Sequence, residues 1–193
     1  HYNVVSAFIK SMRGSDPDAA MYWMVRMLEG GEDPGFVCRR MIIFAAEDVG
    51  NADPRALQVA IAAKEAFEYL GLPEAAIPMA QAVTYLAGAP KSNASYKTLR
   101  AAQAAVREHG SLEVPMHLRN APHKGMAALG YSQGYQYPHD VQGHITGDDY
   151  LPAPLAGQRW YRPVEAGYEK TIGERLAHWR TLREQARRKR DGD

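Results

Sequence analysis

Five histidines lie within 36 residues and are the first side chains to test for chemistry: His109, His117, His123, His139 and His144. No two of these histidines have the i, i+4 spacing at which one helix directs two imidazoles at one metal ion. Loops could still bring the rings together, so a small metal or acid–base enzyme remains an alternative. We favour the interpretation that these histidines lie at the surface or pack within loops.

Two adjacent carboxylates, Glu47 and Asp48, lie at the C-terminal end of a predicted helix. Neighbouring positions on a helix point in different directions, so we predict a salt bridge to a nearby arginine rather than paired acid–base catalysis. The sequence contains no Gly-x4-Gly-Lys-Ser/Thr loop, no Gly-x-Gly-x2-Gly after a strand and no Gly-x-Ser-x-Gly elbow. Motif chemistry therefore identifies no catalytic residue and no cofactor site in this chain.

Basic and aromatic residues are mixed over Pro115–Lys124 and Gly130–Tyr137, and the last predicted helix is strongly basic. Such surfaces bind DNA through phosphate contacts and base stacking. The candidate DNA contacts are Arg119, His123, Lys124, Arg183 and Arg187. The alternative, which we favour, is that the tyrosines anchor the segment and the basic groups are solvated.

Composition is that of a globular protein: 193 residues, 46% hydrophobic and 23% charged, with a net charge of +1. There is therefore no overall field that would attract nucleic acid or an acidic membrane. Cys38 is the only cysteine, and we expect it to be a buried, unreactive thiol. No apolar run reaches the ~18 residues of a membrane span. The chain begins at His1 within a helical pattern, and we expect it to be a fragment of a longer protein.

Three Asp-Pro pairs, at Asp16, Asp33 and Asp53, predict helix starts, because the aspartate accepts from free backbone N–H groups and proline suits the first turn. The helices predicted in this way and from apolar spacing cover 3–13, 16–28, 33–50, 53–71, 73–88 and 94–109. The fifth helix is either kinked at Pro78 or begins near Ile77. The regular cap spacing also allows an α-solenoid, although no side-chain repeat accompanies it.

The predicted fold is all-α, in a single domain over 1–193. A helical bundle occupies 1–110, and an extended strap rich in proline, glycine and tyrosine occupies about 111–165 and wraps the bundle. The strap contains a short helix near 122–129, and a basic helix follows at 166–190. The helix at 16–28 is apolar on nearly every side, which predicts either a central buried helix or a subunit interface.

Several motifs resemble one known family, in order along residues 1–170. They are Lys10–Trp23 (KSMRGSDPDAAMYW), Gly31–Pro34, Ala46–Gly50, Ala52–Leu57, Tyr85–Leu86, Ala89–Asn93, Pro115–Pro122, Leu129–Tyr131, Gly134–Tyr135, Tyr150–Pro152 and Tyr161–Pro163. The chain resembles the C-terminal region of the replication-associated recombination protein A family of AAA+ ATPases. This family is also called maintenance of genome stability protein A and includes relatives of the Werner helicase-interacting protein.

The resemblance implies an oligomerisation domain with a fold akin to the clamp-loader collar, which forms homotetramers and has no catalysis of its own. The parent protein would be a cytoplasmic, nucleoid-associated, DNA-dependent ATPase that maintains stalled forks and acts in recombination and repair. Its partners would be DNA and single-stranded-DNA-binding protein. ATP and magnesium would bind the ATPase core, which precedes this region. Neither ligand would bind within this chain.

The interface of such an oligomer would include part of the apolar helix at 16–28. The candidate interface residues are Tyr22, Trp23, Arg26 and Met27. The rival interpretations are direct DNA binding by the basic strap and last helix, and the enzyme built on loop histidines.

Overall fold

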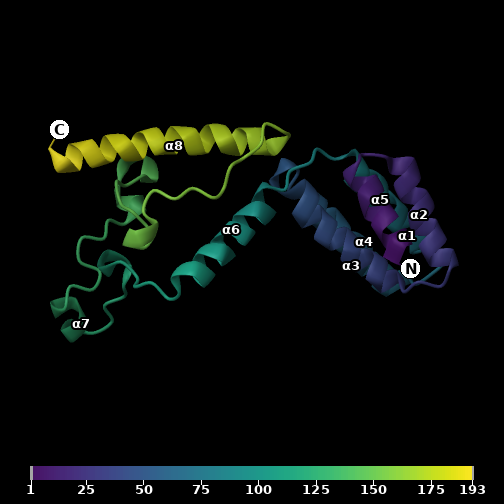
Figure 1. Ribbon diagram of the computed structural model, residues 1–193, viewed down its shortest axis with the longest axis horizontal. Helices are drawn as coiled ribbons and strands as arrows, with labels where there is room; N and C mark the ends of the chain where they lie inside the picture. The colour runs from purple at the N-terminus through teal and green to yellow at the C-terminus, as the bar shows by residue number, and fades with distance from the viewer. Residues whose placement is uncertain (1, 193) are drawn as a thin grey trace. The chain divides into compact units, whose positions relative to one another are not determined.

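The regular elements over residues 2–192, the part that the computed structural model describes, are α-helices and short 3-10 or π turns (Figure 1). The all-α prediction is therefore confirmed. The α-helices are α1 (Tyr2–Arg13), α2 (Pro17–Glu29), α3 (Pro34–Phe44), α4 (Arg55–Leu70), α5 (Ala76–Gly88), α6 (Ala94–His109), α7 (Lys124–Ala128) and α8 (Tyr168–Asp191). No helix in this part of the chain has the length and apolar content needed to cross a membrane.

The chain divides into two compact units. The first consists of the residues up to Arg100 together with Tyr161–Gly173, and the second of Ala101–Trp160 together with the residues from Glu174 onward. The expectation of a single oligomerisation domain over 1–193 stays a prediction.

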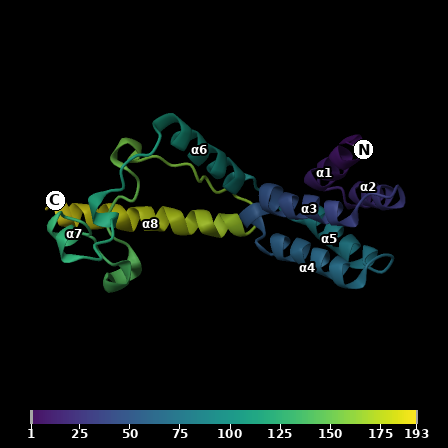
Figure 2. The same ribbon diagram turned by 90° about the horizontal axis from the view of Figure 1, so that it is seen from below.

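The first unit is a helical bundle with a methionine-rich core. Helix α1 packs on α2, α2 packs on α5, and α4 packs on both α3 and α5. Helices α3, α4 and α5 lie side by side in Figure 2. The largest fully buried apolar side chains are Phe8, Met12, Met24, Met41, Phe44, Met79 and Leu86. Helix α4 contributes Ala56, Ala60 and Ala63 to this core, and such small side chains allow close approach of neighbouring helices.

Asp-Pro caps begin α2 and α3 as predicted. Asp16 Oδ1 accepts from the Ala19 N–H at 2.9 Å, and Asp33 Oδ1 accepts from the Gly35 N–H at 3.0 Å. At the third pair, Pro54 is the cap residue of α4, while Asp53 accepts from the Arg55 N–H at 3.1 Å. Helix α5 begins at Ala76, so Pro78 lies in its first turn and the alternative of a start near Ile77 is correct.

The helix predicted over 33–50 changes its hydrogen bonding before it ends. Helix α3 stops at Phe44, and a π-helical turn follows at Ala45–Val49. This turn carries Asp48, whose Oδ1 accepts from Arg13 Nε at 2.7 Å. The predicted salt bridge is therefore confirmed, and this hydrogen bond raises the pKa of Arg13.

Helix α2 is not buried on all sides within the chain, which corrects one of the two sequence-based alternatives. Ala20, Met24 and Met27 face the core, whereas Tyr22 and Val25 are exposed. Apolar composition alone cannot distinguish a helix buried in its own domain from one that keeps an apolar outer face for another chain.

The segment 161–173 returns to the first unit through a buried carboxylate. Glu169 is 0% exposed, and its Oε1 accepts from Ser92 Oγ at 3.0 Å and from the Val164 N–H at 2.9 Å. Gly167 has φ +54°, and a Cβ there would collide with the Ala52 carbonyl oxygen. The chain therefore needs both a glycine and a buried acceptor to enter α8 at this place.

The second unit contains most of the predicted strap. Its residues 111–160 form α7 and 3-10 turns at Met116–Leu118, Pro138–Asp140, Gln142–His144 and Ala153–Leu155. This part of the strap belongs to the same compact unit as α8 from Glu174 onward, and the expectation that the strap wraps the bundle stays a prediction. The predicted short helix is confirmed but covers only Lys124–Ala128.

Loss of the α2 cap is the first testable prediction. Asp16→Ala removes the acceptor of the Ala19 N–H, so the free energy of unfolding should decrease by about 1 kcal/mol. Urea unfolding followed by circular dichroism measures this change. Asp16→Asn keeps a side-chain oxygen and should retain most of the stability, and equal losses in both variants would contradict a capping role.

The Cys38 thiol is fully buried, and burial raises its pKa to about 11. At pH 8 we expect iodoacetamide to alkylate the folded chain at least about a hundredfold more slowly than the unfolded chain, because the thiolate is the nucleophile. Since the pKa is raised in the folded state, the associated stability is complete below the unfolded pKa of about 8.5 and is lost as the pH rises toward 11. Equal alkylation rates in the folded and guanidinium-unfolded chain would contradict this prediction.

Candidate functional site

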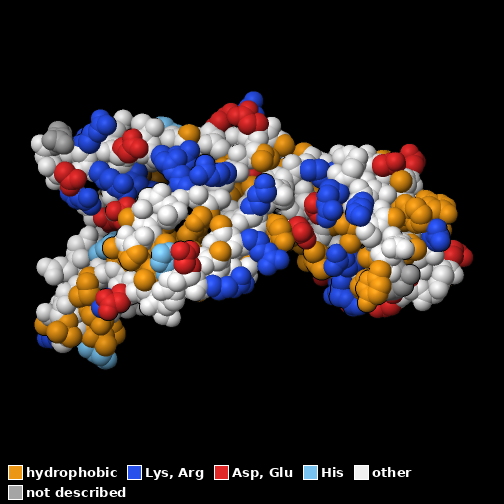
Figure 3. Space-filling view, viewed as in Figure 1, with side chains coloured by type: hydrophobic (Ala, Val, Ile, Leu, Met, Phe, Trp, Pro, Cys, Tyr) orange, Lys and Arg blue, Asp and Glu red, His pale blue; other side chains and the backbone are white. Residues whose placement is uncertain are grey.

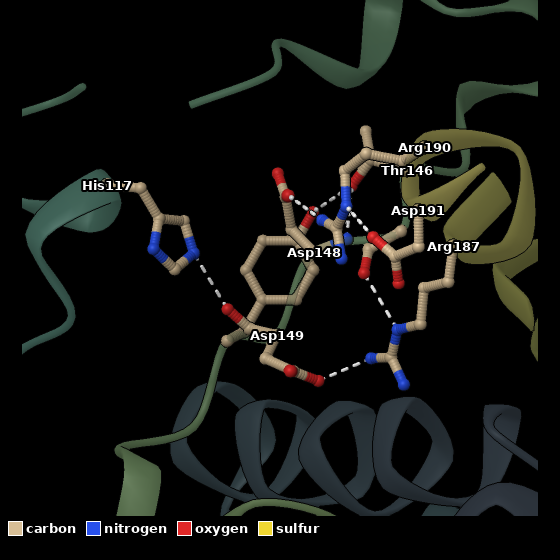
Figure 4. Close-up of polar contacts among 9 residues, drawn as sticks. His117, Thr146, Asp148, Asp149, Arg187, Arg190 and Asp191 are labelled. Atoms are coloured by element: carbon tan, nitrogen blue, oxygen red, sulfur yellow. Dashed lines mark hydrogen bonds and ion pairs between the residues drawn. The ribbon is translucent and has the colours of Figure 1, made fainter. Parts of the chain in front are cut away.

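The strap meets the C-terminal half of α8 in the second unit, through a set of polar contacts (Figure 4). The strap contributes Thr146, Asp148 and Asp149, and α8 contributes Arg187 and Arg190. Within the strap itself, the Asp149 carbonyl oxygen lies 2.8 Å from His117 Nε2. Residues far apart in the sequence are thus joined at one place.

Arg187 holds the strap to the helix. Its Nε donates to the Gly147 carbonyl oxygen at 2.8 Å, and its guanidinium forms an ion pair with the Asp149 carboxylate. The approach is close, since a Cβ at Gly147 would lie 2.9 Å from Arg187 Cγ and 3.1 Å from the Arg187 backbone nitrogen. Glycine at position 147 is therefore a requirement of this junction.

Asp148 is buried beside this junction, with 7% of its surface exposed. Its Oδ1 lies 3.4 Å from Arg190 Nη1, and its backbone N–H donates to Thr146 Oγ1 at 3.3 Å. Within the described part of the chain, Asp148 Oδ2 is buried without a hydrogen-bond partner. The hydroxyls of Thr146 and Tyr150 lie 3.1 Å apart, which orients Tyr150 next to the junction.

A pocket of about 270 Å³ opens next to these contacts. Its wall on α8 contains Arg180, Arg183 and Arg187, whose spacing of three and four residues places them on one face of the helix. The other lining residues are Asp148, Asp149, Tyr150, Leu151, Ala156, Gly157, Gln158, Arg159 and Glu184. The Arg183 guanidinium lies 5.8 Å from the centre of the Tyr150 ring. In Figure 3, Lys and Arg side chains gather over α8.

The structure places two of the five candidate DNA contacts, Arg183 and Arg187, in this pocket. Arg119 is held elsewhere in the strap, where its Nε donates to the Val114 carbonyl oxygen at 2.8 Å and its guanidinium lies over the Tyr131 ring. His123 and Lys124 are exposed at the start of α7. The five candidates therefore do not form one surface through shared contacts.

Sequence reasoning did not select Arg159 and Arg180, which also line the pocket. The helical spacing of Arg180 with Arg183 and Arg187 was a usable signal for one of these two arginines. Arg159 comes from the irregular strap, and no periodicity connects it to α8.

Two of the loop histidines, His139 and His144, contact each other. The rings of His139 and His144 lie 5.0 Å apart, and His144 Nδ1 lies 3.3 Å from the Pro138 carbonyl oxygen. Over residues 2–192, no group of three or more His, Cys, Asp or Glu side chains is arranged to hold a metal ion.

The candidate interface residues on α2 differ in exposure. Tyr22 is 58% exposed, and its ring makes an edge contact with Trp23 at 4.9 Å. The exposed Arg26 guanidinium lies 5.2 Å from the centre of the half-buried Trp23 ring. Met27 is 5% exposed and packs into the core of its own bundle, so little of it remains for a partner.

Comparison with known proteins identifies the family to which this chain belongs. The family described as MgsA AAA+ ATPase C terminal matches residues 14–180. The chain belongs to this family. Replication-associated recombination protein A of Coxiella burnetii is 53% identical over 185 residues, which is 95% of this chain and 42% of that protein. The protein of the same name from Escherichia coli K12 is 51% identical over 177 residues, which is 91% of this chain and 40% of that protein.

A eukaryotic protein is also similar to this chain. ATPase WRNIP1 of Dictyostelium discoideum is 43% identical over 162 residues, which is 83% of this chain and 18% of that protein. The chain thus spans about two fifths of the length of these bacterial relatives and less of the eukaryotic one. The matching family is the C-terminal part of an AAA+ ATPase.

Gly147 provides a test of the strap–α8 junction. Gly147→Ala inserts a methyl group against Arg187, so we expect the second unit to lose about 1–3 kcal/mol of stability. Gly125→Ala is the matched control in the same unit, because a Cβ at that position meets no atom within 4 Å. Hydrogen exchange of residues in the second unit measures the change, and equal protection in both variants would contradict a close approach.

Proposed function

We propose that this chain is the homo-oligomerisation domain of a clamp-loader-like, DNA-dependent AAA+ ATPase that acts in replication-fork maintenance, recombination and repair. The family match and the names of the bacterial relatives support the cellular role. The assembly proposed is a homotetramer. ATP and magnesium bind the ATPase core of the parent protein, which is cytoplasmic and associates with DNA and single-stranded-DNA-binding protein.

The exposed face of α2 is the observation that carries this proposal. Tyr22, Val25 and Arg26 share one face of the helix by their spacing of three and four residues, and all three are exposed. The ring of Trp23 supports the Arg26 guanidinium through a cation–π contact. Aromatic and arginine side chains are enriched at the centres of protein–protein interfaces, where they contribute much of the binding energy.

Further large apolar side chains are exposed on α4, on α5 and between them. They are Leu57, Ile61, Tyr69, Leu70, Leu72 and Ile77. Exposed apolar surface is a feature of protein–protein interaction sites, and one homotetramer can use two different faces. Assembly through this domain would raise the effective concentration of the ATPase cores on one DNA molecule.

Direct DNA contact is the second candidate function. The observation that favours it is the arginine-lined pocket on α8, since guanidinium groups recognise phosphate oxygens through paired N–H donors.

The oligomeric state tests the first proposal. Multi-angle light scattering at high micromolar concentration should give about four times the 21.4 kDa mass of one chain. Tyr22→Asp places a charge on the proposed interface without disturbing the core, so we expect it to shift the assembly to smaller species.

Tyr69→Asp is the comparison variant, because Tyr69 is 91% exposed on a different helix of the same unit. A strict monomer for the unmodified chain would overturn the oligomerisation proposal. Dissociation by Tyr69→Asp together with an intact Tyr22→Asp assembly would move the interface from α2 to α4.

A further inference from the structure

We propose that the pocket on α8 binds a phosphate group through Arg159, Arg180 and Arg183. This inference deepens the second candidate function, direct DNA contact, and is independent of the oligomerisation proposal. The pocket lies wholly within the second unit, and its four lining arginines come from two segments, Arg159 from the strap and the others from α8.

Among the pocket residues that form no ion pair, positive charges outnumber negative charges. Three acidic residues line it, but Asp149 pairs with Arg187, and Asp148 pairs with Arg190. Over the described residues, Arg159, Arg180 and Arg183 form no hydrogen bond or ion pair, and Glu184 is the one lining acid that is also unpaired. The pocket therefore retains an excess of guanidinium groups, which an anion would neutralise.

Arg180 and Arg183 are half-buried, so their N–H donors are partly removed from water. No acceptor in the described part of the chain takes the place of the lost water. The clearest case is Arg183 Nε, which is buried and has no hydrogen-bond partner among the described residues. A desolvated donor without an acceptor lowers stability, and a multiply charged oxyanion supplies several acceptors at once. Phosphate fits this requirement better than a neutral ligand.

The surrounding contacts hold one of the three arginines, Arg183, in place. The Tyr150 ring supports the Arg183 guanidinium at 5.8 Å, and the Tyr150 hydroxyl lies 3.1 Å from Thr146 Oγ1. Arg187 is already engaged by Gly147 and Asp149, so it joins the strap to α8 rather than serving the ligand. A guanidinium that is fixed in advance, as that of Arg183 is, binds an anion with a smaller cost in side-chain entropy.

The size of the pocket favours a small group. At about 270 Å³ it is slightly smaller than the ~300–1,000 Å³ of typical organic ligand sites. It can hold a phosphate, and the exposed ring of Tyr150 at its edge can stack on what the phosphate carries. The phosphate can belong to a single strand of DNA or be free in solution, and the experiment separates these sources.

Two probes and the whole 193-residue chain test the proposal. Fluorescence anisotropy follows a labelled oligothymidylate single strand, and phosphorus NMR line broadening follows inorganic phosphate. The variant Arg180→Gln/Arg183→Gln should weaken binding of at least one probe by about tenfold or more. If the strand binds here, its logarithmic salt dependence should become shallower by about 0.7 for each phosphate that the variant no longer neutralises.

Two control variants sharpen the result. Arg188→Gln makes the same type of charge change on α8 but at an exposed position outside the pocket, so it should change affinity by less than twofold. Glu184→Gln removes the unpaired acid and should tighten binding. Circular dichroism should remain unchanged in all variants, because Arg180 and Arg183 form no hydrogen bond within the described chain.

Binding of phosphate but not of the strand, with weakening in the double variant, supports the pocket and removes direct DNA contact as a function. Binding of both probes with that weakening supports both. Strand binding that the double variant and Arg188→Gln reduce equally overturns the pocket while leaving DNA contact in place. Absence of binding by both probes also overturns the proposal.

Discussion

The hydrogen bonds to the buried carboxylate of Glu169 are the interaction on which the return of the chain to the first unit depends. The carboxylate accepts from the Ser92 hydroxyl, 77 residues earlier, and from the Val164 backbone, and thereby fixes the segment that leads into α8. Because residues on both sides of 101–160 belong to the first unit, this bond holds the end at which the chain returns to that unit. Insertions between two parts of one unit are tolerated where the two ends are held by the parent fold, and here Glu169 and Gly167 hold the return end.

Local signals in the sequence were sufficient for the helices of the bundle. Asp16 and Asp33 act within three residues of their donor groups, and the apolar spacing of Phe8 and Met12 is repeated within one helix. The pairing of Asp48 with Arg13 was predictable only as a type of contact, since no pattern identified the partner. Features that depend on a few neighbouring residues are therefore readable without the structure.

Features that depend on distant residues were not readable in this way. The tyrosines of the strap predicted packing against something, but only the structure shows that Gly147 and Asp149 meet Arg187. The pocket needs Arg159 from the strap next to the arginines of α8, and no spacing relates these positions. Similarly, the composition of α2 indicated an unusual helix, and the exposure of Tyr22 and Val25 required knowledge of what the rest of the bundle covers.

The core of the bundle is rich in methionine, which affects how the helices pack and how the protein responds to oxidation. Five of the eight methionines are buried there, namely Met12, Met24, Met27, Met41 and Met79. Unbranched thioether side chains refill gaps with little strain, so the helices can shift slightly when an outer face is covered. Burial also protects these atoms from peroxide, whereas a sulfoxide would be polar within the core. The rate of methionine oxidation would therefore report transient opening of the bundle, residue by residue, in a mass spectrum.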